Sequence, residues 1–232
     1  MLKVSKYTTG VIQTNVYFCL DTETGRCIII DPAANAARIT EIVEKQLKAK
    51  PEAILLTHGH FDHMMAAAET AAHFSVKIHA SETERALLGN PVWNLSENFG
   101  TSVTVTDFVP LKDGEHLELL GRDWQVIATP GHTAGSVCYY TADTGDRAGT
   151  EAGAGDAAPI LFSGDTLFKE SFGRSDFPTG SEKQLMESIT EKLLPLPEDT
   201  AVYPGHEGTT TIGNERKFNP AAYLSKLGRD NV

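Results

Sequence analysis

The segment His58-Gly-His-Phe-Asp-His63 constrains this chain more than any other feature of its sequence. It places three of the eight histidines and one carboxylate within a single short run. Such a dense set of metal-ligand side chains is costly to keep in a fold unless it binds a metal ion. We therefore interpret the segment as a metal-binding motif.

The residues before the motif indicate how its side chains are placed. Residues 53–57 are apolar and β-rich and predict a strand that ends just before the motif. His58 and His60 then lie in extended chain and point to the same side, where they can hold one metal ion together. Asp62 and His63 fall where a helix is expected to begin, and they point to a second metal position. Imidazole and carboxylate ligands favour zinc, with iron or manganese as alternatives.

Three further candidate ligands each follow a glycine that comes soon after a predicted strand. They are His132 in Thr129-Pro-Gly-His132, Asp165 in Phe162-Ser-Gly-Asp165 and His206 in Tyr203-Pro-Gly-His206. Loops on a rigid scaffold are where binding and catalytic residues concentrate. The sequence therefore predicts that these three side chains complete the metal site.

The order His-x-His-x-Asp-His, followed by His, Asp and His, resembles the metallo-β-lactamase fold superfamily. Within it, the context resembles the glyoxalase II-like branch, the hydroxyacylglutathione hydrolases, over nearly the whole chain. The resemblance implies a first metal ion on His58, His60 and His132, a second on Asp62, His63 and His206, and a bridging Asp165. It also implies that Asp31, in Ile-Ile-Asp31-Pro, supports the ligand loop, because a carboxylate in that position orients imidazole rings.

Strands alternate with helices in two comparable halves, which predicts an α/β fold with two sheets face to face and helices outside. The resemblance implies the same architecture, a four-layer αββα sandwich of two mixed sheets in a single domain over residues 1–232. The expected strands are 11–20, 26–31, 53–57, 76–79, 115–120, 124–129, 136–141, 160–162 and 201–203, and the expected helices include 35–50, 64–74 and 181–194. Capping boxes are expected at Ser81 to Glu84 and at Ser181 to Gln184. Residues 143–158 have little to bury and are expected to form a mobile surface loop.

The resemblance implies a hydrolase of acyl thiolesters, with hydroxyacylglutathione or a related small molecule as substrate. Two metal ions about 4 Å apart would share a water that becomes hydroxide near neutral pH and attacks the carbonyl. Asp62 is expected to orient this hydroxide. A thiolate leaves with little proton assistance, so no separate general acid is expected.

Two other functions stay open. A mononuclear iron persulfide dioxygenase would use only His58, His132 and Asp165, although Pro178 and the intact Gly205-His206 argue against it. A non-catalytic metal-binding module is also compatible, since fold does not fix function. Lactam hydrolysis is a poorer hypothesis, because zinc β-lactamases of the common type have cysteine in place of Asp165.

Arg174 lies in Phe172-Gly-Arg-Ser-Asp-Phe-Pro-Thr-Gly180, a stretch that resembles one shared by small glyoxalase II-like proteins and persulfide dioxygenases. In one interpretation Arg174 receives a substrate carboxylate. In the other it pairs with Asp176 and shapes the loop. The sequence supports both interpretations equally.

The chain departs from full-length glyoxalase II after the last candidate ligand. Only 26 residues follow His206 in this sequence of 232. We therefore expect the helical C-terminal region, which supplies much of the glutathione site in that branch, to be largely missing. We expect the chemistry to carry over, but not glutathione specificity, and a more open site.

The composition of the chain limits the classes of binding partner that we expect. The net charge of −11 disfavours nucleic acid and anionic membrane surfaces, which attract Lys and Arg. The three cysteines have apolar neighbours and are expected to be small buried side chains, although Cys19 and Cys27 could face each other across a hairpin. An odd cysteine and no signal peptide favour the cytoplasm. The oligomeric state is left open.

Overall fold

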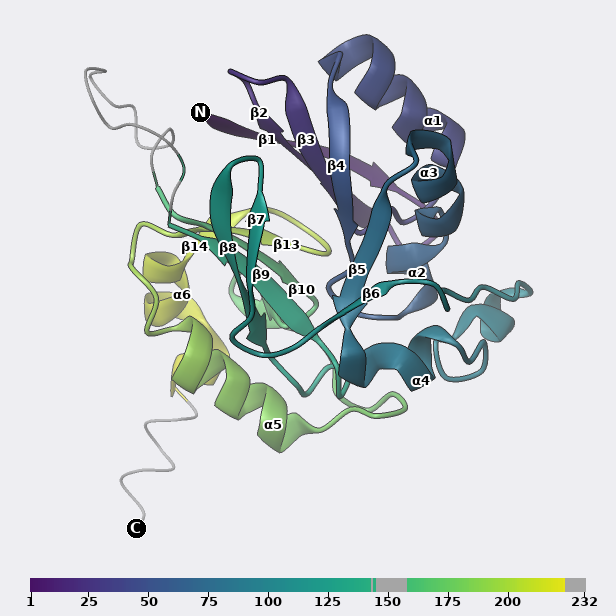
Figure 1. The fold of residues 1–232 in the computed structure, drawn as a ribbon. Helices are drawn as coiled ribbons and strands as arrows, with labels where there is room; N and C mark the ends of the chain where they lie inside the picture. Colours follow the sequence, from purple (N-terminus) through teal and green to yellow (C-terminus); the bar gives the residue numbers. More distant parts are fainter. Residues whose placement is uncertain (143, 145–157, 224–232) are drawn as a thin grey trace.

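The computed structural model describes residues 1–142, 144 and 158–223, which form two six-stranded sheets (Figure 1). In pairing order, the first sheet contains β1 (Leu2–Thr9), β2 (Thr14–Asp21), β3 (Arg26–Ile30), β4 (Lys50–Leu55), β5 (Lys77–Ser81) and β6 (Val109–Leu111). The second contains β14 (Thr210–Thr211), β13 (Ala201–Pro204), β10 (Ile160–Gly164), β9 (Val137–Thr141), β8 (Arg122–Ala128) and β7 (His116–Leu119). A separate short ribbon pairs β11 (Leu167–Phe168) with β12 (Ser171–Phe172).

Both sheets are mixed. In the first, β1, β2 and β3 pair antiparallel, whereas β3, β4, β5 and β6 run parallel. In the second, β10 and β13 are parallel and their other neighbours are antiparallel. The expected pair of mixed sheets is confirmed.

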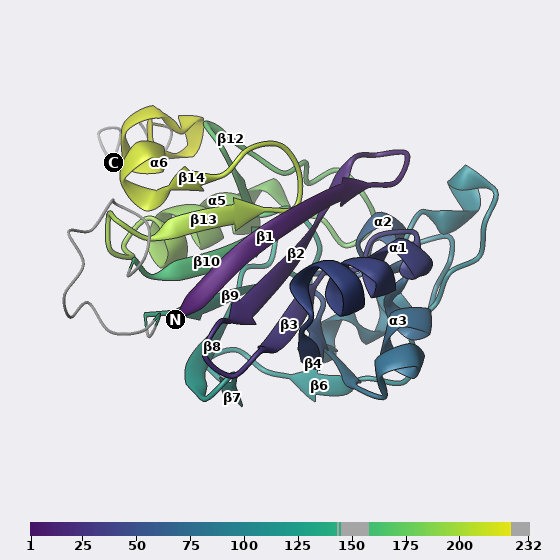
Figure 2. The same ribbon diagram turned by 90° about the horizontal axis from the view of Figure 1, so that it is seen from above.

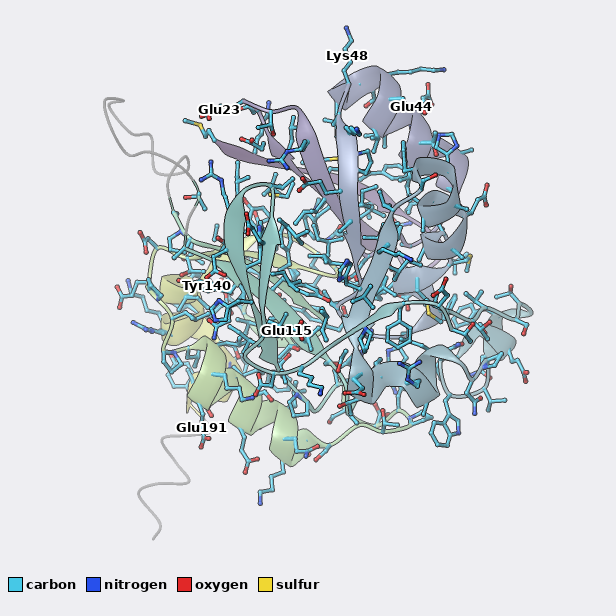
Figure 3. The ribbon with its side chains drawn as sticks, in the orientation of Figure 1. Glu23, Glu44, Lys48, Glu115, Tyr140 and Glu191 are labelled. Atoms are coloured by element: carbon cyan, nitrogen blue, oxygen red, sulfur yellow. The ribbon has the colours of Figure 1, made fainter. Side chains whose placement is uncertain are left out.

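Helices cover the outer face of each sheet (Figures 1 and 2). On the first sheet lie α1 (Ala36–Glu41), which continues as a π-helical segment over Ile42–Leu47, and α3 (Ala67–Phe74). On the second lie α5 (Glu182–Glu187), which continues as a π-helical segment over Ser188–Leu193, and α6 (Ile212–Phe218). Short turns of helix are α2 (Phe61–Met64), α4 (Arg85–Leu88), and the 3₁₀ turns Glu82–Glu84 and Ser96–Phe99. The labelled Glu44, Lys48 and Glu191 lie on or directly after the π-helical segments that continue α1 and α5, on the outside of the molecule (Figure 3).

Three apolar clusters fill the spaces between the four layers. Along β3, Ile28 and Ile30 pack between the sheets, whereas Cys27 and Ile29 pack against α1 and α3, because successive strand residues face opposite sides. The third cluster joins the second sheet to α5 and α6. The expected αββα sandwich is therefore confirmed. Each cluster holds one buried free cysteine: Cys27 in the outer layer of the first sheet, Cys19 between the sheets and Cys138 beneath α5.

Several local predictions were wrong. The suggestion that Cys19 and Cys27 face each other fails, because they lie on opposite faces of the sheet. The capping box at Ser81 is also wrong: Ser81 makes no capping hydrogen bond, and Glu84 is buried and bonds elsewhere. At Ser181 the side chain accepts from the backbone N–H of Gln184, as expected of a helix cap.

Element boundaries shifted where turns intervened. The strand expected from residue 11 begins at Thr14, because residues 10–13 turn the chain back from β1. The helix expected over 64–74 is two helices, α2 and α3. The expected loop 143–158 lies outside the described residues except for residues 144 and 158. Within the described parts of the chain, no helix has the length and apolar character that crossing a bilayer requires.

Candidate metal centre

The seven predicted ligands meet at one edge of the sandwich, where strands of both sheets end. The backbone joins the sheets there: the N–H of Val137 donates to the carbonyl of Thr57 at 2.8 Å, and the N–H of Asn15 donates to the carbonyl of Gly205 at 2.7 Å. A further bond runs from the N–H of Gly205 to the carbonyl of Gly164 at 2.8 Å. Loops carried by different strands are therefore fixed against each other before any side chain is considered.

His58, His60 and His132 form the first group. Their Nε2, Nδ1 and Nε2 atoms lie 3.1, 2.9 and 3.2 Å apart in pairs, so the three nitrogens make a nearly equilateral triangle. A tetrahedral zinc ion with Zn–N bonds of about 2.0–2.1 Å separates its nitrogen ligands by roughly 3.3 Å. The chemistry and spacing of this triangle fit a bound cation.

The remaining nitrogens of two of these rings are held by neighbours. Nδ1 of His132 donates to the backbone carbonyl of Arg174 at 2.6 Å. Nδ1 of His58 lies 3.2 Å from Oγ1 of Thr57. Such bonds fix the tautomer and turn the other nitrogen, with its lone pair, toward the centre of the group.

Asp62, His63 and His206 form the second group, with Asp165 between the two. Oδ2 of Asp62 lies 3.5 Å from Nε2 of His63 and 3.4 Å from Nε2 of His206. Oδ2 of Asp165 lies 3.4 Å from Nε2 of His206 and 3.6 Å from Nε2 of His132. One carboxylate thus faces a member of each group.

Two buried atoms, one on His63 and one on Asp165, have no hydrogen bond. Nε2 of His63 and Oδ1 of Asp165 are 3.3 Å apart but do not bond to each other. Buried polar atoms are nearly always satisfied, so such a pair needs an explanation. A cation between them provides one.

Asp31 lies behind the ligands. Its Oδ2 accepts from Nδ1 of His63 at 2.9 Å and from the hydroxyl of Thr57 at 2.7 Å, and its Oδ1 accepts from the N–H of Thr57 at 2.8 Å. One buried carboxylate therefore orients the His63 ring and the chain that leads into the motif.

The pKa values of the histidines differ between the two groups. Burial lowers the pKa of His60 to about 3 and also lowers the pKa values of His58 and His132, so these rings are neutral near pH 7. Burial acts in the same direction on His63 and His206. The carboxylates of Asp165 and Asp62 outweigh it, and they raise the pKa of His206 to about 9 and that of His63 well above its usual value.

Gly205 shows why glycine stands next to a ligand. A Cβ at this position would overlap Oδ1 of Asp165 and Cε1 of His63. The two side chains come this close to the backbone only because residue 205 has no side chain. The Gly-His pattern in the sequence thus reflects packing of the site itself.

Glu84 was not predicted to take part in the site. Its side chain is 1% exposed, and its Oε1 accepts from the N–H of Gly59 at 2.9 Å. It also accepts from the N–H of Gly135 and the hydroxyl of Thr133, while burial raises its pKa. Glu84 therefore joins the loop of the 58–63 motif to the loop that carries His132. The sequence contained its signal, a Glu three residues after Ser81, but that pattern is the same as a capping box.

Comparison with known proteins agrees with this geometry. Residues 9–146 match the family described as the metallo-beta-lactamase superfamily. The chain belongs to this superfamily. The predicted resemblance is thereby confirmed at that level, and the superfamily's use of divalent metal ions accords with the His and Asp groups found here.

Three relatives in the superfamily are informative. Hydroxyacylglutathione hydrolase GloC of Haemophilus influenzae is 34% identical over 83% of this chain and 85% of its own. The crystal structure of BLEG-1 B3 metallo-beta-lactamase is 35% identical, with a TM-score of 0.82 over 94% of this chain and 98% of that one. TTHA1623, solved in a di-iron-bound form, is 31% identical, with a TM-score of 0.77 over 93% and 98% of the two chains.

A pocket of about 730 Å³ opens above the candidate ligands of this superfamily member. Arg174 lines it, but both ends of its guanidinium bond to Asp176 at 2.6 Å and the group stacks 3.9 Å from the ring centre of Phe177. The structure thus contains the internal pair that was one of the two interpretations of Arg174. Contact with a substrate carboxylate stays a prediction. His73 and His116 pair with surface carboxylates, and neither they nor His79 line the pocket.

Proposed function

We propose that this protein is a dinuclear metal-dependent hydrolase of acyl thiolesters, with two divalent ions, most readily zinc, on the seven side chains. The observation that carries the proposal is the pair of ligand groups with Asp165 facing both. A single-metal site would need only one of these groups. The protein similarity to GloC, a hydroxyacylglutathione hydrolase, supports the choice of thiolesters.

Divalent ions held there would supply hydroxide near neutral pH and polarise the substrate carbonyl. Asp62 is ionised in this setting. Burial alone would raise its pKa, but His63 and the hydrogen bonds from His206 and Thr14 outweigh burial and lower the pKa to about 2. Its Oδ2 accepts from the hydroxyl of Thr14 at 2.8 Å, which fixes the carboxylate. Asp62 can therefore accept a hydrogen bond from the attacking water and hold it in line with the carbonyl.

A second candidate activity is lactam hydrolysis. It is favoured by the likeness to BLEG-1, a B3 metallo-beta-lactamase, over nearly the full length of both chains. Thiolesters and lactams both present a carbonyl to the nucleophile, so the same ligand groups serve either reaction. Thiolester hydrolysis is preferred here because Asp165 faces both groups, as the glyoxalase II-like resemblance implies.

The experiment is elemental analysis of purified protein, with activity assays on the same sample. The substrates are a panel of acyl thiolesters, a chromogenic cephalosporin, and glutathione persulfide with an oxygen electrode. We expect about two zinc-class ions per chain and thiolester turnover. One iron per chain with oxygen uptake and no hydrolysis would replace the proposal with the persulfide dioxygenase, and cephalosporin turnover alone would replace it with the lactamase.

A further inference from the structure

The pocket above the metal centre is lined by apolar side chains and by polar side chains that make hydrogen bonds within the protein. The apolar ones are Ile12, Phe61, Leu95, Phe99, Phe168 and Phe177. Ile12 is 38% exposed and Phe99 is 51% exposed, which is high for large apolar side chains. Apolar groups gathered in a concave site indicate a surface that is covered when a ligand binds.

Two of these rings reach the metal centre itself. The ring centre of Phe177 lies 5.5 Å from that of His60, in the first ligand group. The ring centre of Phe168 lies 6.0 Å from that of His206, in the second. A carbonyl placed between the two ligand groups would therefore have an aromatic ring on each side.

The polar side chains of the pocket are already engaged within the protein. Among the described lining residues that can donate, five make internal bonds: Lys6 and Asn15 to the carbonyl of Glu207, Thr8 to Asn15, Gln13 to the carbonyl of Gly10, and Arg174 to Asp176. These bonds hold the polar side chains in place, and Lys6 and Arg174 keep further N–H donors, because an ammonium has three and a guanidinium has five. The apolar side chains, in contrast, gain only when a ligand covers them. Glu207 also lines the pocket, and its backbone carbonyl holds both Lys6 and Asn15.

From these contacts we infer that the substrate is a thiolester with an apolar acyl group of several carbons or an aromatic ring. This inference rests on the proposed function, since it names the substrate class of that site. The binding free energy comes from burial of the acyl group against the apolar wall. A small hydroxyacyl group or an acyl group that ends in a carboxylate gains less, because it buries less apolar surface and brings a polar group against the apolar wall.

The first test uses thiolesters of one neutral thiol, N-acetylcysteamine, with acetyl, butanoyl, hexanoyl and benzoyl groups. Each methylene that becomes buried should raise kcat/KM by about threefold to fourfold. Succinyl provides a matched comparison with butanoyl, because it has the same chain length and adds one negative charge. We expect the kcat/KM of butanoyl to exceed that of succinyl by at least about tenfold, because a carboxylate placed against the apolar wall loses part of its hydration.

Variants locate the effect in the pocket. Phe99→Ala should lower the hexanoyl-to-acetyl ratio of kcat/KM by about threefold or more, because part of the wall is removed. Phe218→Ala is the matched control, since Phe218 is 57% exposed on α6 and does not line the pocket. The control should leave the ratio unchanged.

A binding measurement separates this inference from the proposed function. Ketone analogues, in which a methylene replaces the thiolester sulfur, are titrated calorimetrically with the same acyl series. Tighter binding of longer analogues without thiolester turnover would refute the proposed reaction and leave the apolar preference standing. Turnover with a flat acyl series, a preference for succinyl, or analogues that do not bind would overturn the inference.

Discussion

At the scale of single residues, the seven candidate ligands were predictable, and Glu84 was not. The ligands can be recognised in the sequence because metal binding requires particular side chains. Close packing also requires glycine beside them, as at Gly205. Glu84 bonds to backbone groups of Gly59 and Gly135, and a bond to a backbone N–H leaves no residue-specific trace in the partner's sequence. Its role became visible only when the loops were placed side by side.

Asp62 gives a direct test of the mechanism. Asp62→Asn should reduce kcat by at least about a hundredfold, the range of a positioned proton acceptor, and its loss as a ligand adds to this. The measurement is steady-state kinetics at equal metal content, determined on each sample. Thr14→Val removes only the hydrogen bond to Asp62 and should lower kcat by about tenfold. Unchanged activity in Asp62→Asn would refute the mechanism.

Glu84 should matter for metal affinity without touching the metal. Glu84→Gln places an amide donor opposite N–H and hydroxyl donors, so we expect a loss of about 1–3 kcal/mol in unfolding free energy. We also expect metal affinity to fall by about tenfold to a hundredfold, measured by competition with a chelating dye. Glu82→Gln is the matched control, because the Glu82 side chain is 54% exposed. Equal metal affinity in both variants would show that Glu84 does not position the ligand loops.

At the scale of elements, buried strands were predictable and the first strand was not. Residues 27–30 of β3 form an unbroken apolar run, which indicates a strand buried on both faces. β1 is an edge strand with only Leu2 fully buried, so its polar residues hide the alternation. Residues 11–13 were likewise predicted to be strand, yet they lie in a turn where Val11 and Ile12 are exposed. Ile12 lines the pocket.

The two predicted capping boxes offer a matched comparison. Ser181 accepts from the N–H of Gln184 at 3.4 Å, whereas Ser81 has no capping bond. Ser181→Ala should lower the unfolding free energy by about 0.5–1 kcal/mol, the lower part of the range for N-caps. Ser81→Ala should cost less. Chemical denaturation of both variants measures the difference, and equal losses would contradict the assignment of the cap.

At the scale of the whole molecule, the sandwich was predictable because its three apolar clusters follow from two-sided strands and one-sided helices. The register between the sheets was not, since it depends on backbone bonds such as that from Val137 to Thr57. These bonds lie beside the candidate ligands, so we expect metal binding and the docking of the two sheets to be coupled.

Removal of the metal should therefore destabilise the fold. A ligand at a thousand times its Kd adds about 4 kcal/mol to the unfolding free energy. We expect dialysis against a chelator to lower Tm by several degrees or more, and readdition of zinc to restore it. Differential scanning calorimetry measures the shift, and an unchanged Tm would show that the ligand groups hold no ion that the folded state prefers.

The positions of the three cysteines allow partial opening of the fold to be measured separately in each layer. Cys27, Cys19 and Cys138 sit in three separate apolar clusters, so each thiol becomes reactive only when its own layer parts. Under native conditions, the labelling rate of each cysteine with a thiol reagent, resolved by mass spectrometry, then gives the opening free energy of one layer. Equal labelling rates would mean that the sandwich opens as a unit. Different rates would show which layer opens most readily.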